Sequence, residues 1–171
     1  VLLLAGRKAR LPAALGLARE ALDDFSASRA REGEKLAEVI LERVARMREL
    51  VRDVGPRIPV AQAAFQDKLK QRLVDALGSA DDDRIRQEVA VFAVRIDVAE
   101  ELARLSTHLD EVERVIKAGG ATGKRLDFLM QELNREANTL GSKSVVTEVS
   151  QTSTELKLLI EQMREQIQNL E

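Results

Sequence analysis

Apolar side chains recur every three or four residues along almost the whole chain, and this spacing constrains the fold more than any other feature. An α-helix turns through about 100° per residue, so residues at this spacing share one face. Only three prolines occur among the 171 residues, and 33% of the residues are charged. Both values are typical of long helices with solvated outer faces. The pattern therefore predicts an all-α fold without β-strands.

Groups of glycine, proline and small polar residues divide this pattern into separate helices. They lie at Gly55–Pro59, Gly78–Ser79, Gly119–Gly123 and Gly141–Ser144. A first helix is predicted from Pro12 to about residue 54, and a third from about residue 81 to residue 117. Because two long helices joined by a short turn usually lie antiparallel, residues 1–80 are predicted to form a helical hairpin and residues 81–171 a second helical domain. Long antiparallel hairpins, a short polar helix and a final coiled-coil-like helix complete the predicted architecture.

The same spacing predicts which side chains face the core. The first helix offers two groups of apolar residues on one stripe, and the final helix alternates mostly in steps of four and three, as in a coiled coil. The predicted core positions are Leu15, Leu22, Phe25, Leu36, Ile40, Val44, Met47, Val51 and Val54; Phe65, Leu69, Leu73 and Leu77; Val91, Val94, Val98, Leu102, Leu105, Leu109, Val112 and Ile116; Leu126, Leu129, Leu133, Ala137 and Leu140; and Val145, Val149, Thr152, Leu156, Leu159, Met163, Ile167 and Leu170.

Composition limits the classes of function. The net charge of −2 provides no attraction of the whole chain to nucleic acid or to a membrane, so any phosphate-binding surface must be a local cluster. The absence of cysteine excludes disulfides and thiolate metal sites. No tryptophan or tyrosine is present to stack on unpaired bases. No apolar run approaches the roughly 20 residues of a membrane span, which predicts no membrane partner.

A polar stripe runs beside the apolar stripe of the predicted third helix. Asp97, Glu101, Arg104, His108 and Glu111 fall within a narrow sector of that helix, and Glu100 lies at its margin. Carboxylates and one imidazole in line are donors that a divalent ion such as Mg²⁺ or Mn²⁺ accepts. Ion pairs within the helix, such as one between Glu101 or Asp97 and Arg104, are the alternative interpretation.

Two basic turns flank the predicted fourth helix. The first contains Gly119, Gly120 and Gly123 and is followed by Lys124 and Arg125, so its N–H groups and charges suit a phosphate. It is not a P-loop, which requires glycine at position 118 and serine or threonine at position 125. The second turn, Gly141–Ser144, carries Lys143, and Ser144 is a natural N-cap for the last helix. Taken alone, the local sequence favours the alternatives, which are a flexible connector at the first turn and a simple helix–helix turn with an N-cap at the second.

The fourth helix carries more amides and charges than folding requires. Asp127, Asn134 and Asn138 share one flank with Gln131 nearby, and Arg125, Glu132 and Glu136 share the other. Together with Arg135, such side chains bind sugars, phosphates and base edges. A polar interface with a neighbouring helix or subunit is the alternative.

Three segments together resemble the C-terminal region of the YicC-like endoribonuclease family, and the resemblance is close over residues 85–171. They read RIDVAEELARLSTHLDE (95–111), GKRLDFLMQELNREANTLGSKS (123–144) and ELKLLIEQMREQIQNLE (155–171). The family implies a bacterial, cytoplasmic endoribonuclease that depends on a divalent metal and assembles as a homohexamer able to enclose RNA. It also implies an N-terminal α/β domain, which we expect to be missing here or reduced to the few residues before Pro12. The positions carried over are Asp97, Glu100, Glu101, Arg104, His108, Lys124, Asp127, Gln131, Glu132, Asn134, Arg135, Glu136, Asn138, Ser142 and Lys143.

These observations predict a metal-dependent endoribonuclease, or the helical portion of one. Within that hypothesis the roles are our own assignment. Catalysis is assigned to His108, Glu101, Asp97, Glu132 and Glu136, metal binding to Asp97, Glu101 and His108, and RNA binding to Arg104, Lys124, Arg125, Asn134, Arg135, Asn138 and Lys143. The cofactor expected is Mn²⁺ or Mg²⁺, and the partners are RNA and further copies of the chain. A non-catalytic helical module for oligomerisation or RNA binding is the alternative, and a nucleotide-phosphate-binding protein is a third.

Overall fold

The computed structural model describes the backbone of residues 2–77 and 82–168 and the side chains of residues 12–76 and 83–168. The described residues form helices and no strand, which confirms the predicted all-α class. The helices are α1 (Leu2–Val54), α2 (Arg57–Leu77), α3 (Asp82–Arg95), α4 (Ala99–Ala118), α5 (Gly123–Lys143) and α6 (Thr147–Gln168). None of these described helices combines the length and the apolar character that a membrane span needs.

The chain divides into two compact units, residues 1–39 and residues 40–171, and α1 continues from one into the other. In the first unit the predicted stripe of Leu15, Leu22 and Phe25 is solvent-exposed, and Phe25 is 63% exposed. The prediction that these residues face a core is therefore wrong for this unit, because a single helix has no second element to cover its apolar face. Pro12 also lies inside α1 rather than at its first turn.

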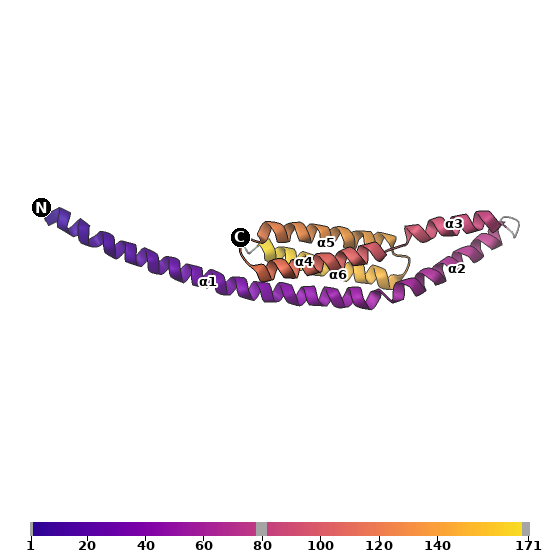
Figure 1. Cartoon of the computed structure of the whole chain (residues 1–171), viewed down its shortest axis with the longest axis horizontal. Helices are drawn as coiled ribbons and strands as arrows, with labels where there is room; N and C mark the ends of the chain where they lie inside the picture. The colour runs from indigo at the N-terminus through magenta and orange to yellow at the C-terminus, as the bar shows by residue number, and fades with distance from the viewer. Residues whose placement is uncertain (1, 78–81, 169–171) are drawn as a thin grey trace. The chain divides into compact units, whose positions relative to one another are not determined.

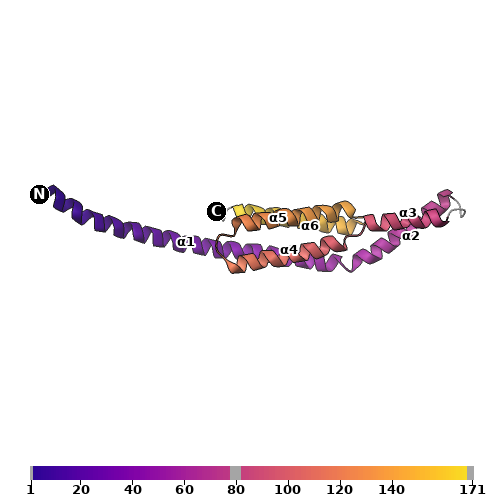
Figure 2. The same cartoon turned by 45° about the horizontal axis from the view of Figure 1, so that its top comes forward.

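In the second unit, α4, α5 and α6 lie side by side, as both Figure 1 and Figure 2 show. The predicted stripe of α5 forms the middle of this core, where Leu126, Leu133 and Leu140 are almost fully buried. The final part of α1 adds Ile40, Val44 and Met47. Long-range ion pairs border the apolar contacts: Arg48 binds Glu113 of α4 at 2.5 Å, and Arg46 binds Glu155 of α6 at 2.8 Å.

The buried face of α6 differs from the predicted one. Val149, Leu156, Met163 and Ile167 are buried as predicted, but Ser153 and Ile160 are buried where Thr152 and Leu159 were expected. The reason is a close approach between α5 and α6. A Cβ atom at Gly141 would lie 2.5 Å from Ser153 Oγ, and this hydroxyl donates a 2.7 Å hydrogen bond to the carbonyl oxygen of Ala137. Leu170 lies outside the described residues.

The helices α2 and α3 form a hairpin, in which the rings of Phe65 and Phe92 stack with centroids 5.0 Å apart. The hairpin predicted for residues 1–80 would pair α2 with the first helix, whereas the structure packs α2 along α3. Only Gly55 and Pro56 separate α1 from α2, since Pro59 fits within the first turn of α2. The predicted cap at Gly78 lies outside the described residues, and the domain division at residue 80 stays a prediction.

A break at residues 96–98 divides the long helix that was predicted from residue 81 to residue 117. There the Asp97 amide donates to the Val94 carbonyl at 3.4 Å, and Asp97 Oδ1 accepts a 3.0 Å hydrogen bond from the Ala99 amide. The two parts pack on different partners, α3 on α2 and α4 on α5. For this reason Val91 and Val94, which were predicted core residues, are exposed, and Val94 is 75% exposed.

The turn between α5 and α6 lies later in the chain than predicted. Gly141, Ser142 and Lys143 continue α5, and Ser144 follows them as its C-cap rather than as the N-cap of α6. The Ser144 hydroxyl donates to the Val146 carbonyl at 2.7 Å. This extra turn brings Lys143 opposite the start of α4.

Candidate metal centre

Polar side chains on one flank of α4 meet polar side chains on one flank of α5, and we call this set of contacts the α4–α5 ladder. Because the two helices are antiparallel, the partners run in opposite order along the chain. From one end to the other the pairs are Glu111 with Arg125, His108 with Glu132 and Glu136, Arg104 with Glu136, and Glu101 with Lys143. The polar stripe predicted beside the core of α4 therefore faces the Glu132 flank of α5.

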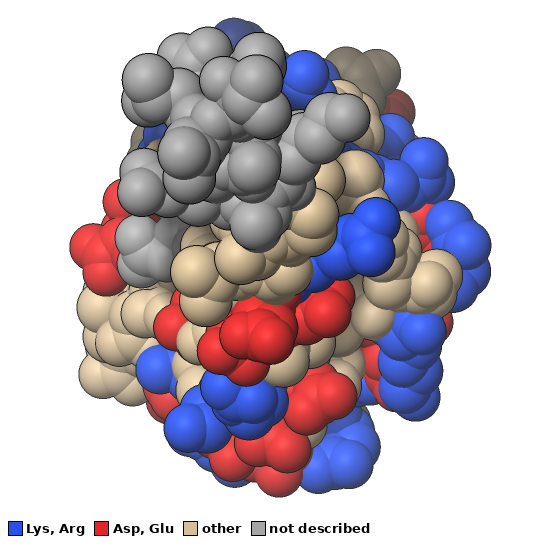
Figure 3. Space-filling model, turned by 90° about the vertical axis from the view of Figure 1, so that its left-hand side faces the viewer, with Lys and Arg blue, Asp and Glu red and all other residues tan. Residues whose placement is uncertain are grey.

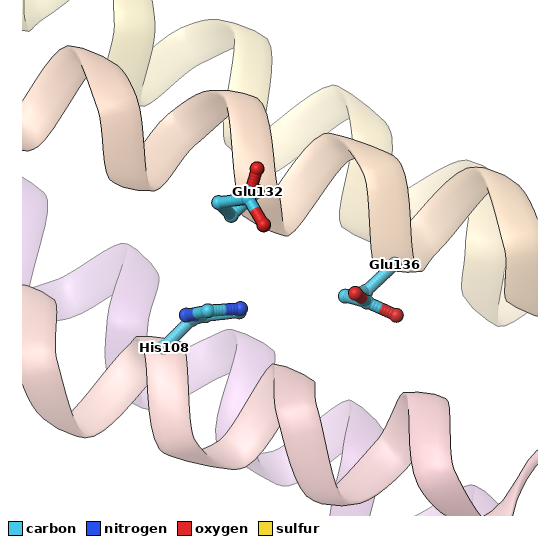
Figure 4. Close-up of side chains that lie close together, drawn as sticks. All are labelled: His108, Glu132 and Glu136. Atoms are coloured by element: carbon cyan, nitrogen blue, oxygen red, sulfur yellow. The ribbon is translucent and has the colours of Figure 1, made fainter.

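At the centre of the ladder, His108 points from α4 towards Glu132 and Glu136 of α5, as Figure 4 shows. One ligand atom from each of the three residues lies within 4.8 Å of the other two. The side chains of His108 and Glu132 are half-buried, and that of Glu136 is buried. Within the described part of the chain, neither His108 nor Glu132 makes a hydrogen bond or an ion pair.

The Glu136 carboxylate is the most enclosed acid of this group, with 5% of its side chain exposed. Its ion-pair partner among the described residues is Arg104, whose Nη1 lies 3.4 Å from Glu136 Oε1. Charge-assisted hydrogen bonds are usually about 2.7–2.9 Å long, so this contact is a long one. The buried Glu136 carboxylate is therefore balanced, over a long contact, by one guanidinium among the described residues.

The donor set fits a divalent cation. An ion with ligand distances of about 2.0–2.2 Å separates its ligand atoms by up to about 4.4 Å, slightly less than the 4.8 Å within which these three donors lie. Carboxylate oxygens suit Mg²⁺ and Mn²⁺, and an imidazole nitrogen favours a transition ion. The charges agree as well, because the carboxylates of Glu100, Glu132 and Glu136 exceed the single guanidinium of Arg104 at this position.

At one end of the ladder, Lys143 closes the space between α5 and the start of α4. Its Nζ donates to Glu101 Oε1 at 2.8 Å and to the Asp97 carbonyl at 3.0 Å. The Glu101 side chain is 9% exposed, and its Oε2 is buried without a hydrogen-bond partner in the described structure. Glu101 is thus ion-paired with Lys143, and it lies two helical turns before His108 on α4.

At the other end, Glu111 binds both Arg114 of its own helix and Arg125 of α5. The hydrogen bonds from Arg114 and then Arg125 lower the pKa of the Glu111 carboxyl to about 2. This carboxylate is ionised throughout the physiological pH range and saturated with cations. It is therefore a structural contact between helices.

The structure groups the predicted metal ligands differently from the sequence. His108 was assigned together with Asp97 and Glu101, but the structure places it with Glu132 and Glu136. Asp97 caps the first residue of α4 from the break at residues 96–98, and Glu101 pairs with Lys143. The two glutamates were predicted as catalytic, and their spacing of four residues was the signal that both face one neighbour.

The predicted RNA-binding residues occupy three places. Arg125 and Lys143 are engaged in the ladder, and Arg104 is its half-exposed central cation. Lys124 is exposed at the start of α5, where a cavity of about 300 Å³ lies against Asp127 and Arg164. On the remaining surface of α5 the structure exposes Asn134, Arg135, Asn138 and Gln131, the last donating to Asp127 at 2.9 Å. Ser142 donates to the Thr139 carbonyl at 3.0 Å.

The basic turn before α5 has the conformation that its glycines predict. Gly119 and Gly120 have φ angles of 67° and 84°, in the region that favours glycine.

On the face of the molecule that Figure 3 shows, basic and acidic side chains are interspersed. This agrees with the net charge of −2.

The chain matches a protein-family model. The model is described as "Endoribonuclease YicC-like, C-terminal" and covers residues 54–171. This range includes α2 to α6 and every residue of the α4–α5 ladder. The family suggested by the segments of α4, α5 and α6 is confirmed.

Two curated proteins are similar over most of the chain. A "Probable endoribonuclease YicC" of Haemophilus influenzae is 49% identical over 150 residues, which are 88% of this chain and 52% of that protein. A protein of the same name from Clostridioides difficile is 34% identical over 155 residues, which are 89% of this chain and 53% of that protein. The chain thus spans about half the length of these relatives.

Proposed function

The chain belongs to the YicC-like endoribonuclease family, and on that premise we propose that it is the helical part of a metal-dependent enzyme that cleaves phosphodiester bonds within RNA. The observation that carries this proposal is the group formed by His108, Glu132 and Glu136. Two of these residues have no partner among the described residues, and the third is a buried carboxylate with one long contact. An imidazole and two carboxylates that face one another across two helices could together hold an ion.

In the proposed site, His108, Glu132 and Glu136 hold Mn²⁺ or Mg²⁺. When bound, the ion would supply positive charge to the phosphate at which the backbone is cleaved. The protein contributes the fixed spacing of the donors, because Glu132 and Glu136 lie one helical turn apart on α5 and the core below them holds α4 in place. Proton transfer by His108 at its imidazole remains the alternative to a ligand role.

The proposed RNA contacts are the cations and amides around this group. Arg104 is nearest, and Lys124, Arg135, Asn134 and Asn138 are exposed on α5. Arg125 and Lys143 would have to exchange a glutamate for a phosphate in order to take part, because both are ion-paired. We therefore rank Arg104 above them as the contact to the reacting phosphate.

The cleavage reaction and the ion are tested together. The chain is incubated with a structured RNA and Mn²⁺, then with EDTA, and Mn²⁺ binding is measured separately by calorimetry. We expect EDTA, His108→Ala and Glu136→Gln each to abolish both binding and cleavage. Glu161→Gln on the exposed face of α6 is the matched control and should behave as the original chain. Cleavage that persists in EDTA and in both variants would show that the metal assignment is wrong.

A second candidate function is a helical assembly module without chemistry of its own. It is favoured by the exposed Leu15, Leu22 and Phe25 of α1, which need a partner, and by the ion pairs at both ends of the ladder. A homo-oligomer, which the family resemblance describes as a hexamer, would provide that partner. Light scattering distinguishes the two candidates when it is paired with the assays above. A stable oligomer that binds neither Mn²⁺ nor RNA at low salt supports the module.

A further inference from the structure

Arg104 is the residue of the ladder that two acids share. Its Nη2 lies 2.5 Å from Glu100 Oε1 of its own helix, and its Nη1 lies 3.4 Å from Glu136 Oε1 of α5. The Arg104 side chain is 52% exposed, whereas Glu136 is buried. Arg104 thus lies between a candidate metal ligand and solvent, and this position suggests a role beyond charge balance.

We propose that Arg104 couples ion binding to RNA binding: it neutralises Glu136 when the ion is absent and contacts an RNA phosphate when the ion is present. The inference rests on the proposed function, since it takes His108, Glu132 and Glu136 as the ion site. It concerns the same site and adds that Arg104 changes its partner from Glu136 to an RNA phosphate when the ion binds.

The electrostatics of Glu136 explain the first state. Its carboxylate is desolvated, so it needs a cation nearby, and Arg104 is that cation among the described residues. The guanidinium is therefore occupied at both of its Nη atoms, by Glu136 and by Glu100. An arginine in this state has little to gain from a phosphate, because it would leave a buried carboxylate unpaired.

A divalent ion changes this balance. With two positive charges beside its other contacts, Glu136 no longer requires the guanidinium, and Arg104 and the ion repel each other. Glu100, which is one turn before Arg104 and exposed, keeps the guanidinium at the solvent side of the ladder. The freed N–H groups form part of a planar fork that suits two oxygens of a phosphate.

The charge of Arg104 is secure in both states. Hydrogen bonds from Glu100 and then Glu136 raise the pKa of its guanidinium above the ordinary value. The switch is therefore one of partner and not of protonation. Because coupling is reciprocal, RNA must also strengthen ion binding by the same factor as the ion strengthens RNA binding.

The test measures RNA affinity with and without the ion. A 2′-O-methyl oligonucleotide, which resists cleavage, is titrated into the chain and into Arg104→Met, first with EDTA and then with saturating Mn²⁺. Without the ion we expect the two affinities to agree within about twofold. With Mn²⁺, Arg104→Met should bind about tenfold more weakly, because one charge-assisted contact is lost. Its plot of log affinity against log salt should also be shallower by about 0.7, which is one phosphate of a single strand.

Two further variants separate this role from general effects. Arg114→Met removes the same charge from α4 at a position that pairs with Glu111, and it should show no ion-dependent loss. Arg104→Lys keeps the charge without the fork and should recover part of the loss. Thermal unfolding of each variant confirms that the helices remain folded.

The inference is overturned if Arg104→Met weakens RNA binding equally with and without Mn²⁺, which would make Arg104 a simple phosphate contact, or if it weakens neither. These results leave the proposed function intact provided that the original chain binds Mn²⁺ and cleaves RNA. If calorimetry shows no Mn²⁺ binding to the original chain, the proposed function fails, and this inference fails with it.

Discussion

The ends of the α4–α5 ladder and its centre use the same kinds of side chain in opposite arrangements. At the ends the acid lies on α4 and the base on α5, as in Glu101 with Lys143 and Glu111 with Arg125. At the centre the two acids that face His108, Glu132 and Glu136, lie on α5, while α4 provides His108 and Arg104, which also binds the exposed Glu100. The ends are closed by ion pairs, whereas the centre keeps an excess of carboxylate. Ion pairs between helices fix their position, and an uncompensated acid beside an imidazole is suited to bind a cation.

The largest expected effect on Mn²⁺ affinity comes from placing a basic residue at the centre of the ladder, so that the centre forms an ion pair as the ends do. Glu132→Lys places an ammonium beside Glu136 and removes one donor, so Mn²⁺ affinity should fall by at least about 100-fold, more than the loss typical of changes to residues around a ligand. Stability without metal should not decrease, because the excess negative charge is removed. Calorimetry and thermal unfolding measure the two quantities. Glu132→Gln is the matched control, since it removes the charge without adding a cation; if both variants keep the Mn²⁺ affinity of the original chain, the centre is not an ion site.

The next largest effect comes from removing the ion pair at one end of the ladder. Lys143→Met leaves Glu101 buried without its cation, and Lys143 itself is 31% exposed. We expect a loss of about 2–3 kcal/mol in the free energy of unfolding, somewhat below the usual value for a fully buried pair. Mn²⁺ affinity should change little. Denaturant unfolding checks the loss, and Lys157→Met on the exposed face of α6 serves as the control. A large loss of Mn²⁺ affinity with unchanged stability would reverse the roles assigned to ends and centre.

The smallest effect concerns the other end and depends on pH. The pKa of Glu111 is lowered to about 2 in the folded protein, below its ordinary value of 4.5. A lowered pKa means that the stabilisation is complete above pH 4.5 and disappears as the pH falls through that value towards 2. The difference in unfolding temperature between the original chain and Glu111→Gln should therefore be small and constant above about pH 5. It should vanish near pH 2, and a difference that grows on acidification would contradict the ion-pair assignment.

Much of the fold was accessible from the sequence because helical periodicity is local. The buried stripe of α5, with Leu126, Leu133 and Leu140, follows from the spacing of those residues alone. So does the division of the polar residues of α5 into a flank with Glu132 and Glu136 and another with Asn134 and Asn138. These properties depend only on the angle between residues of one helix.

The pairing of His108 with Glu132 and Glu136 instead depended on the position of one helix along another. The break at residues 96–98 places Asp97 outside α4, so it no longer shares a helix face with His108. Because α5 continues past Gly141, Lys143 reaches Glu101 and forms an ion pair with it. The close contact of Gly141 with Ser153 likewise selects the buried face of α6. No periodicity encodes these relations, since they follow from which apolar surfaces pack best in three dimensions.

The sequence by itself therefore determined a helical chain of the YicC-like family and the types of side chain that its site contains. Only the tertiary structure decided which acids stand beside the single histidine and which are closed by lysine or arginine. The physical reason is that composition and spacing set what each helix face carries. Packing between two helices sets which carboxylate receives a cation from its neighbour and which is left without one.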